Sequence, residues 1–214
     1  MRKSKAFLYN ALLLVAVSLI MRTVGIYFNV YISNKIGAVA IGVFSLVSGI
    51  YGFGITLATS GVNLAVTRLV SEALGREQPG EIRRIMTRCV LYAAGFGLLA
   101  AVLLLSLAET IAFRWLDDLR TTRPLRLLAL ALPLISVTSA LNGYFTAIRK
   151  VYKNAITVFV EQCIRIFCTV LLLGSLLPSG VEYSCIALAG GAVLAELSSL
   201  IIMSVLYLLD PGRK

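Results

Sequence analysis

The chain has 214 residues, of which 59% are hydrophobic, and a formal net charge of +10. Its mean hydropathy of +0.91 excludes an ordinary soluble domain, and its continuous apolar runs exclude a β-barrel, in which apolar and polar residues alternate. The basic residues lie mostly at the ends of apolar runs, where they set membrane orientation, so the charge does not indicate nucleic-acid binding.

The apolar runs predict an all-α polytopic membrane protein, a six-helix transmembrane bundle that forms one unit over residues 1–214. The N-terminal basic residues precede a run without a convincing cleavage site, so we expect a retained first span rather than a signal peptide. The six expected spans are 7–32, 38–66, 89–108, 127–148, 155–177 and 185–209.

The first span carries a stripe of small and polar residues spaced three or four apart. They are Ser18, Arg22, Gly25, Asn29 and Ser33, and this spacing places them on one helical face. A stripe of this kind lines a protein interior or an aqueous cavity, and Arg22 is its only charge. We therefore interpret Arg22 and Asn29 as candidate cavity residues, with Arg22 in the outer half of the membrane unless the helix is bent.

The turn at residues 34–37 leads into a glycine-rich second span, which favours close helix packing or bending. The polar segment 68–88 that follows has breaks at Gly75 and at Pro79–Gly80, and its two arms are amphipathic. This pattern predicts cytoplasmic interfacial helices. The third span has no charge, and Pro133 predicts a kink in the fourth.

The fifth span places Glu161 and Arg165 four residues apart, the spacing of an ion pair along one helix. At about 1.5 Å per residue, Arg165 lies about 18 Å from Lys153, and Glu196 of the sixth span lies about 21 Å from Asp210. These depths predict that Arg165 and Glu196 share a level in the membrane.

Two interpretations of these intramembrane charges remain open. In one, Arg22 and Arg165 line a cavity and bind an anionic head group such as a diphosphate. In the other, Glu161 pairs with Arg165, Glu196 pairs with an arginine, and the charges only hold the bundle together. Glu161 and Glu196 are in addition candidates for a coupling site for a proton or a sodium ion.

An enzyme is not expected. Asp117 and Asp118 form an acidic pair of the kind that binds magnesium diphosphate, but no second acidic cluster completes such a site. The chain has no histidine and no nucleophile motif, so we expect no catalytic residue, no metal and no cofactor.

Several motifs resemble those of a known family. They are Met21–Gly25, Asn34–Gly37, the stretch LATSGVNLAVTRLVSEALGR at 57–76, Leu141–Phe145, Val160–Arg165 and Gly191–Glu196. In this order they resemble the N-terminal lobe of polysaccharide-transport proteins in the multidrug/oligosaccharidyl-lipid/polysaccharide exporter superfamily, within the stage V sporulation protein B-like branch.

The resemblance implies a flippase that moves an undecaprenyl-diphosphate-linked saccharide across the bacterial cytoplasmic membrane by alternating access. It implies that Arg22 matches a first-helix arginine that faces the central cavity. Related lipid II flippases carry second-helix arginines near positions that are Ile55 and Thr56 here, a departure that argues against lipid II as the substrate.

The family has two lobes, and this chain corresponds to the first one only. It is expected to be a truncated reading frame, a half-transporter that needs a second lobe, or a lobe that forms a homodimer. The partners implied are membrane lipids and an anionic lipid-linked saccharide, without nucleic acid. The alternatives are a cation-coupled multidrug exporter and a non-transporting remnant or interaction subunit. The distribution of Lys and Arg predicts that both termini are cytoplasmic.

Overall fold

The structure is a computed structural model that describes residues 2–76, 79–176 and 180–210, with side chains described for 19–76, 80–175 and 180–210. All regular secondary structure in these ranges is helical. The elements are α1 (Arg2–Thr59), α2 (Val62–Gly75), α3 (Pro79–Arg114), the short 3₁₀ helix η1 (Leu119–Thr121), α4 (Thr122–Ala129), α5 (Leu132–Ala147), α6 (Val151–Leu176) and α7 (Val181–Leu208).

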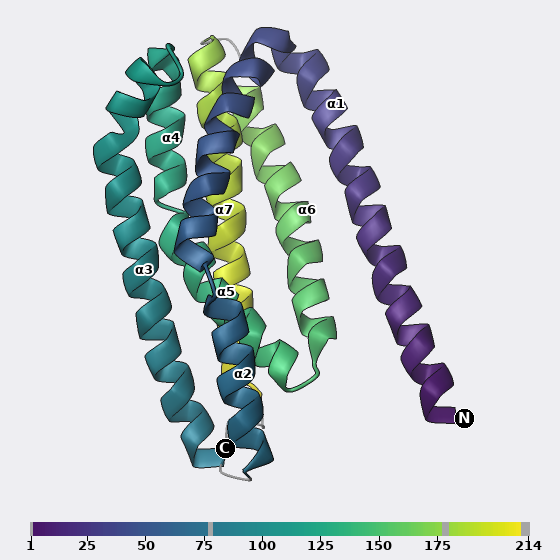
Figure 1. Ribbon diagram of the computed structural model, residues 1–214. Coiled ribbons are helices and arrows are strands. Elements are labelled where there is room, and N and C mark those ends of the chain that lie inside the picture. The colour runs from purple at the N-terminus through teal and green to yellow at the C-terminus, as the bar shows by residue number, and fades with distance from the viewer. Residues whose placement is uncertain (1, 77–78, 177–179, 211–214) are drawn as a thin grey trace.

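Helix α1 is broken at Gly37, where the backbone is non-helical with φ 82° and ψ 164°. A residue with a side chain rarely adopts this positive φ, so glycine permits the sharp turn. We call residues 2–36 the first arm and residues 38–59 the second arm. In Figure 1 the first arm rises on the right, the chain turns at the top, and the second arm descends toward α2.

A second break, at Ser60–Gly61, separates the second arm from α2, and Gly61 has φ 71°. Segment 68–88, for which we expected cytoplasmic interfacial helices, forms the end of α2 and the beginning of α3, and its position relative to the membrane stays a prediction. Both ends pack into the core through Val70, Ala73, Ile82 and Met86, which are at most 3% exposed. The amphipathic pattern thus corresponds to the buried faces by which these two helix ends pack into the bundle.

The expected kink of the fourth span is present. Helices α4 and α5 are bent by 40° relative to each other, and Pro133 occupies the first turn of α5. The first turn of a helix tolerates proline because an N–H group there would have no hydrogen-bond acceptor within the helix. The break therefore falls just before Pro133 rather than after it.

Two buried clusters, at opposite ends of the bundle, hold the helices together. One joins the second arm, α3, α4, the beginning of α5 and α7 around Val47, Leu104, Leu128 and Leu132. The other joins α2, α3, α5 and α7, with Tyr144 against Phe145 and Tyr207 in edge-to-face contacts.

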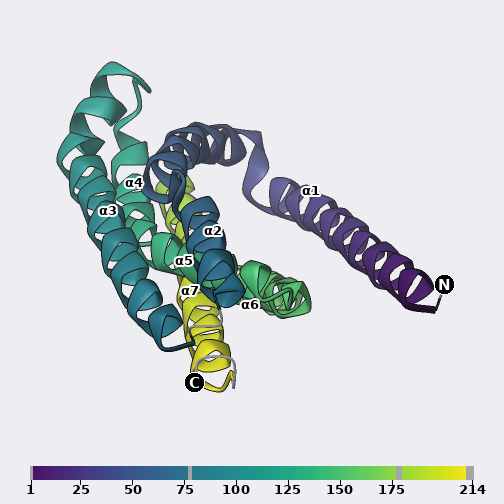
Figure 2. The same cartoon turned by 60° about the horizontal axis from the view of Figure 1, so that its bottom comes forward.

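The first arm is the least integrated element. Figure 2 shows it projecting away from the other helices. Among its described side chains the deepest is Ile32, which is 2% exposed and packs with Leu173, Ala187 and Leu188 close to the Gly37 turn. The rest of its described length is mostly exposed.

At the opposite end, Asp210 fixes the end of α7 to the turn between α5 and α6. Its side chain is fully buried, and its carboxylate lies 2.8 Å from Lys150 Nζ and 2.7 Å from Lys153 Nζ. The Lys153 ammonium lies in addition 4.8 Å from the centre of the Phe145 ring, a cation–π contact.

Four stretches of the described chain are long and apolar enough to span a membrane, and the bent pair α4–α5 makes a fifth. They are Leu19–Gly75, Gly80–Arg114, Val151–Ser175, Val181–Leu208 and, as the bent pair, Leu119–Ala129 with Leu132–Ala147. The all-helical prediction is thus confirmed, whereas the count of six is not established by these criteria.

Candidate functional site

The candidate site is built on the close contact between α6 and α7. A Cβ atom added at Gly191 would collide with Thr169 Oγ1, and one added at Gly190 would lie 3.1 Å from Leu172 Cδ1. The two helices run antiparallel in Figure 1. Small residues at this contact let the helix backbones approach closely, so polar side chains further along the two helices come within reach of one another.

Arg165 and two carboxylates meet beside this contact. Arg165 Nη2 lies 2.7 Å from Glu161 Oε1 on α6 and 3.3 Å from Glu196 Oε1 on α7. The pair along α6 and the shared level of Arg165 and Glu196 are therefore present as the sequence predicted. The Glu161 and Glu196 side chains are 18% and 15% exposed, so the two carboxylates are largely shielded from solvent, whereas the Arg165 side chain is partly exposed.

The electrostatics of this triad are unbalanced, because two carboxylates share one guanidinium group. The net charge is −1 when all three side chains are ionised. Both carboxylates pair with the same nitrogen of Arg165, Nη2. Arg165 Nε is buried and has no hydrogen-bond partner among the described residues. Buried charges are stable only when they are paired, so Arg165 is needed by both acids at once.

A polar cleft of about 280 Å³ adjoins the two carboxylates. Buried Thr138 Oγ1 and Asn142 Oδ1 have no hydrogen-bond partner among the described residues. Such unpaired oxygens indicate a place for water, an ion or a polar ligand. The cleft is lined by Ile55, Thr59, Ile135, Thr138, Ser139, Asn142, Thr157, Val158, Glu161, Glu196 and Ser199.

Tyr51, on the second arm, belongs to the same neighbourhood and was missed by the sequence analysis. Its buried hydroxyl group has no hydrogen-bond partner among the described residues and lies within electrostatic range of Glu196, Arg165 and Glu161. Because a tyrosine in a glycine-rich apolar span is most often a packing residue, nothing in its local sequence distinguished it.

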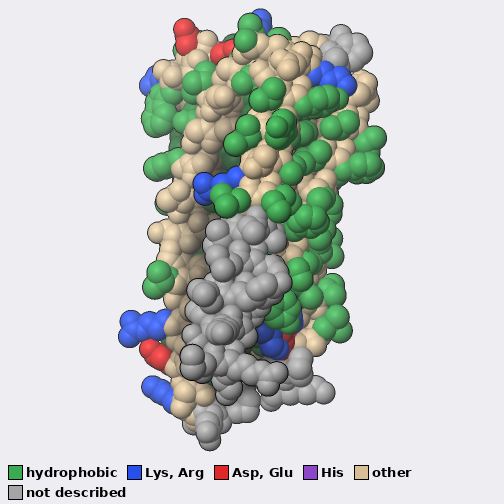
Figure 3. Space-filling model, turned by 90° about the vertical axis from the view of Figure 1, so that its right-hand side faces the viewer, with side chains coloured by type: hydrophobic (Ala, Val, Ile, Leu, Met, Phe, Trp, Pro, Cys, Tyr) green, Lys and Arg blue, Asp and Glu red, His purple; other side chains and the backbone are tan. Residues whose placement is uncertain are grey.

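Arg22 and Asn29 lie on the first arm and are both exposed. Neither forms a hydrogen bond or ion pair with a described side chain in this structure, so Arg22 is not joined to the triad. Figure 3 looks onto this side of the molecule and shows hydrophobic side chains over much of it. The exposed ones on the first arm are Leu19, Ile20, Val24, Ile26, Tyr27, Val30 and Tyr31.

The position of Arg22 along the axis of the bundle follows from the nearby Gly25, where an added Cβ would lie 3.9 Å from Gln162 Nε2 on α6. Gln162 is near the middle of the 26-residue α6. Arg22 precedes Gly25 by three residues, or about 4.5 Å along the helix. Arg22 therefore lies close to the level of the triad along the bundle, whereas its depth in the membrane stays a prediction.

In the described part of the chain, no group of three or more Cys, Asp or Glu residues is arranged so that it could hold a metal ion. Of the acidic pair noted in the sequence, Asp117 and Asp118, the second contacts the local backbone. Asp118 caps η1 by accepting a hydrogen bond from the Arg120 backbone N–H at 2.9 Å, and Asp117 has a positive φ of 49°.

Comparison with known proteins gives one family and one relative. A model of the family described as polysaccharide biosynthesis protein matches residues 7–212. Stage V sporulation protein B of Bacillus subtilis (strain 168) is 28% identical over 203 residues, which cover 95% of this chain and 39% of that protein. The chain thus spans well under half of the length of this relative. No solved structure matches it.

Proposed function

The chain belongs to the polysaccharide biosynthesis protein family, and from that premise we propose that it is one lobe of a transporter for an anionic lipid-linked saccharide. The proposed cargo is an undecaprenyl-diphosphate-linked oligosaccharide or cell-wall precursor in the bacterial cytoplasmic membrane. The similarity to a sporulation protein supports this assignment.

The observation that carries the proposal is the placement of Arg22. This exposed guanidinium group lies near the middle of an apolar helix and forms no ion pair with a described residue. A charge within a membrane span is costly, by about 2.5–3.5 kcal/mol, unless it meets water, protein or an opposite charge. A diphosphate group would supply that opposite charge, and a guanidinium group matches phosphate oxygens in geometry.

Asn29 and Arg165 are proposed as further cavity residues. Asn29 follows Arg22 by seven residues, two turns along the same face of the first arm, so its amide group could contact the saccharide or the water around it. The Arg165 side chain is 35% exposed but is held by two carboxylates. We therefore assign Arg22 the main phosphate contact and Arg165 a secondary one.

The proposed topology has six crossings with both termini in the cytoplasm. The stretch Leu19–Gly75 contains 57 residues, which as one straight helix would be about 86 Å long, far more than a hydrocarbon core of about 30 Å. The Gly37 turn divides this stretch into two antiparallel arms, each of which would cross once. The start of α1 and the end of α7 lie at the same end of the molecule in Figure 1, which an even number of crossings requires.

Alternating access is proposed to need a second lobe, supplied by another polypeptide or by a second copy of this chain. A cavity between two lobes opens to alternate sides when the lobes rock against each other. One lobe supplies only one wall of such a cavity. Domain 1–214 would thus be the N-terminal transmembrane lobe of the complete device.

The test measures binding of an undecaprenyl-diphosphate saccharide to the purified chain in nanodiscs, by native mass spectrometry. Arg22→Ala should weaken binding about tenfold or more, because one charge-assisted phosphate contact is lost. Lys35→Ala, which removes a cation from the same arm, is the matched control and should have little effect. Equal binding by wild type and Arg22→Ala would contradict the proposal.

A cation-coupled exporter is the second candidate, and the polar cleft favours it. Glu161, Glu196 and the unpaired oxygens of Thr138 and Asn142 supply acceptor atoms but no cation of their own. Efflux of a cationic drug that is abolished by Glu196→Gln and unaffected by Arg22→Ala would favour this candidate over the first.

A further inference from the structure

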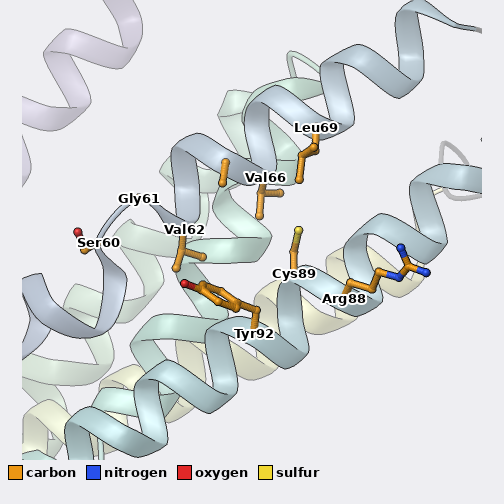
Figure 4. A pocket seen from close by; sticks show the side chains of 9 residues that line it. Ser60, Gly61, Val62, Val66, Leu69, Arg88, Cys89 and Tyr92 are labelled. Atoms are coloured by element: carbon orange, nitrogen blue, oxygen red, sulfur yellow. The ribbon is translucent and has the colours of Figure 1, made fainter.

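Helices α2 and α3 leave an open groove of about 520 Å³ between them, on residues that the polar cleft does not use. Figure 4 shows the groove running from the Ser60–Gly61 break, past Val66 and Cys89, toward Arg88 at its other end. It is lined by Ser60, Gly61, Val62, Ala65, Val66, Leu69, Arg88, Cys89 and Tyr92.

The groove is apolar over most of its length. Its floor is formed by Val62 and Val66, which are 4% and 1% exposed, and Ala65 on its wall leaves space because its side chain is small. Helix α2 is the end of the stretch Leu19–Gly75 and α3 forms the stretch Gly80–Arg114, and both stretches are long and apolar enough to span a membrane. A groove of this kind in a bilayer is filled by hydrocarbon, because water would find few hydrogen-bond partners there.

One end of the groove is positively charged. Figure 4 shows the Arg88 side chain extending toward the beginning of α3. Arg84 lies four residues earlier, so both side chains occur on one face of the helix. Neither arginine forms an ion pair with a described residue, whereas Arg68 on α2 is paired with Glu72 at 2.9 Å.

We infer that this groove binds an anionic phospholipid, with one acyl chain along Val62, Val66 and Tyr92 and the phosphate group at Arg88 and Arg84. The arrangement of an apolar channel that ends in unpaired arginines complements an acyl chain that ends in a phosphate. Basic pockets between transmembrane helices at the cytoplasmic side suit such head groups. Arginine can bind phosphate through two parallel N–H···O bonds.

Phospholipid is the expected occupant rather than the transported lipid because the bilayer supplies it at far higher concentration. The groove begins at the Ser60–Gly61 break, which directly follows Thr59, a residue that lines the polar cleft. A lipid seated there would brace α2 against α3 next to this break. The inference is independent of the cargo, so its failure would leave the proposed function untouched.

The experiment compares phosphatidylglycerol with phosphatidylcholine on the delipidated full chain, by native mass spectrometry. We expect at least tenfold tighter retention of phosphatidylglycerol, a preference lost in Arg84→Gln/Arg88→Gln and kept in Arg68→Gln, the matched control. Ala65→Phe should fill the groove and reduce retention of both lipids. Ala65 is exposed, so this variant should fold, which circular dichroism checks.

Three results would overturn the inference. Equal retention of the two phospholipids by the wild type would remove the role of charge. Unchanged retention in both groove variants would place the lipid elsewhere. Preferential retention of an isoprenoid diphosphate over phosphatidylglycerol in this groove, abolished by Ala65→Phe, would assign the site to the cargo instead.

Discussion

The Asp210 carboxylate is fully buried and lies 2.7 Å from Lys153 Nζ, a contact between residues 57 positions apart in the chain. It ties the end of α7 to the turn that begins α6. Lys150 provides a second ammonium group, 2.8 Å from the same carboxylate.

Asp210→Asn should destabilise the chain by about 3 kcal/mol, because it leaves two ammonium groups without their counter-ion. Lys153→Met should cost less, since Lys150 still neutralises the acid. Thermal unfolding of the purified protein measures both. Arg68→Gln, which removes the exposed pair with Glu72, is the control and should change the stability by about 0.5 kcal/mol or less.

Arg165→Met should destabilise the chain by about 2 kcal/mol, a value reduced from that of a fully buried pair because the side chain is 35% exposed. Two shielded carboxylates then repel each other without a counter-ion. Adding Glu161→Gln to Arg165→Met should restore part of the loss. If the double variant is no more stable than Arg165→Met alone, the two side chains are not coupled.

Gly191→Ala should destabilise the contact between α6 and α7 by about 1–3 kcal/mol, because the new methyl group would overlap Thr169. Thr169→Ala should relieve part of this effect in the double variant. Gly174→Ala is the matched control: no atom lies within 4 Å of its added Cβ, so it should be neutral or stabilising by up to about 1 kcal/mol. The unfolding temperatures of Gly191→Ala, Thr169→Ala, the double variant and Gly174→Ala test these expectations.

Six crossings place Lys35 and Arg149 on opposite sides of the membrane. In a background without native cysteines, Lys35→Cys should react with a membrane-impermeant maleimide added outside the cell. Arg149→Cys should react only after the membrane is opened. Reaction of both positions from the same side would contradict the proposed topology.

Sequence reasoning located those features of the site that depend on local spacing. Glu161 and Arg165 are one helical turn apart, so their pairing follows from helix geometry alone. Glu196 could be aligned with Arg165 because both were counted from the same membrane side. The turn at Gly37 and the break before Pro133 followed from the conformational limits of glycine and proline.

What the sequence left undetermined depends on tertiary contacts. The proximity of Tyr51 to Glu196, Arg165 and Glu161 arises only because the second arm packs beside α6 and α7. Asp210 pairs with Lys150 and Lys153 at the turn that begins α6, far away in the chain, and no local sequence pattern predicts these contacts. The amphipathic periodicity of segment 68–88 did not identify what its apolar face contacts, and the structure buries Ile82 and Met86 in one cluster with residues of α2 and α5.

The breaks at Gly37 and Gly61 give the first arm and the second arm different freedom. The second arm is held along its length by the cluster around Val47, whereas the described part of the first arm is buried mainly at Ile32, next to its turn. Among the described residues, swinging the first arm about Gly37 would separate few packed side chains beyond those around Ile32, and weakly anchored elements open at low free energy. The described segment that carries Arg22 is therefore expected to move more readily than the helices packed around Val47.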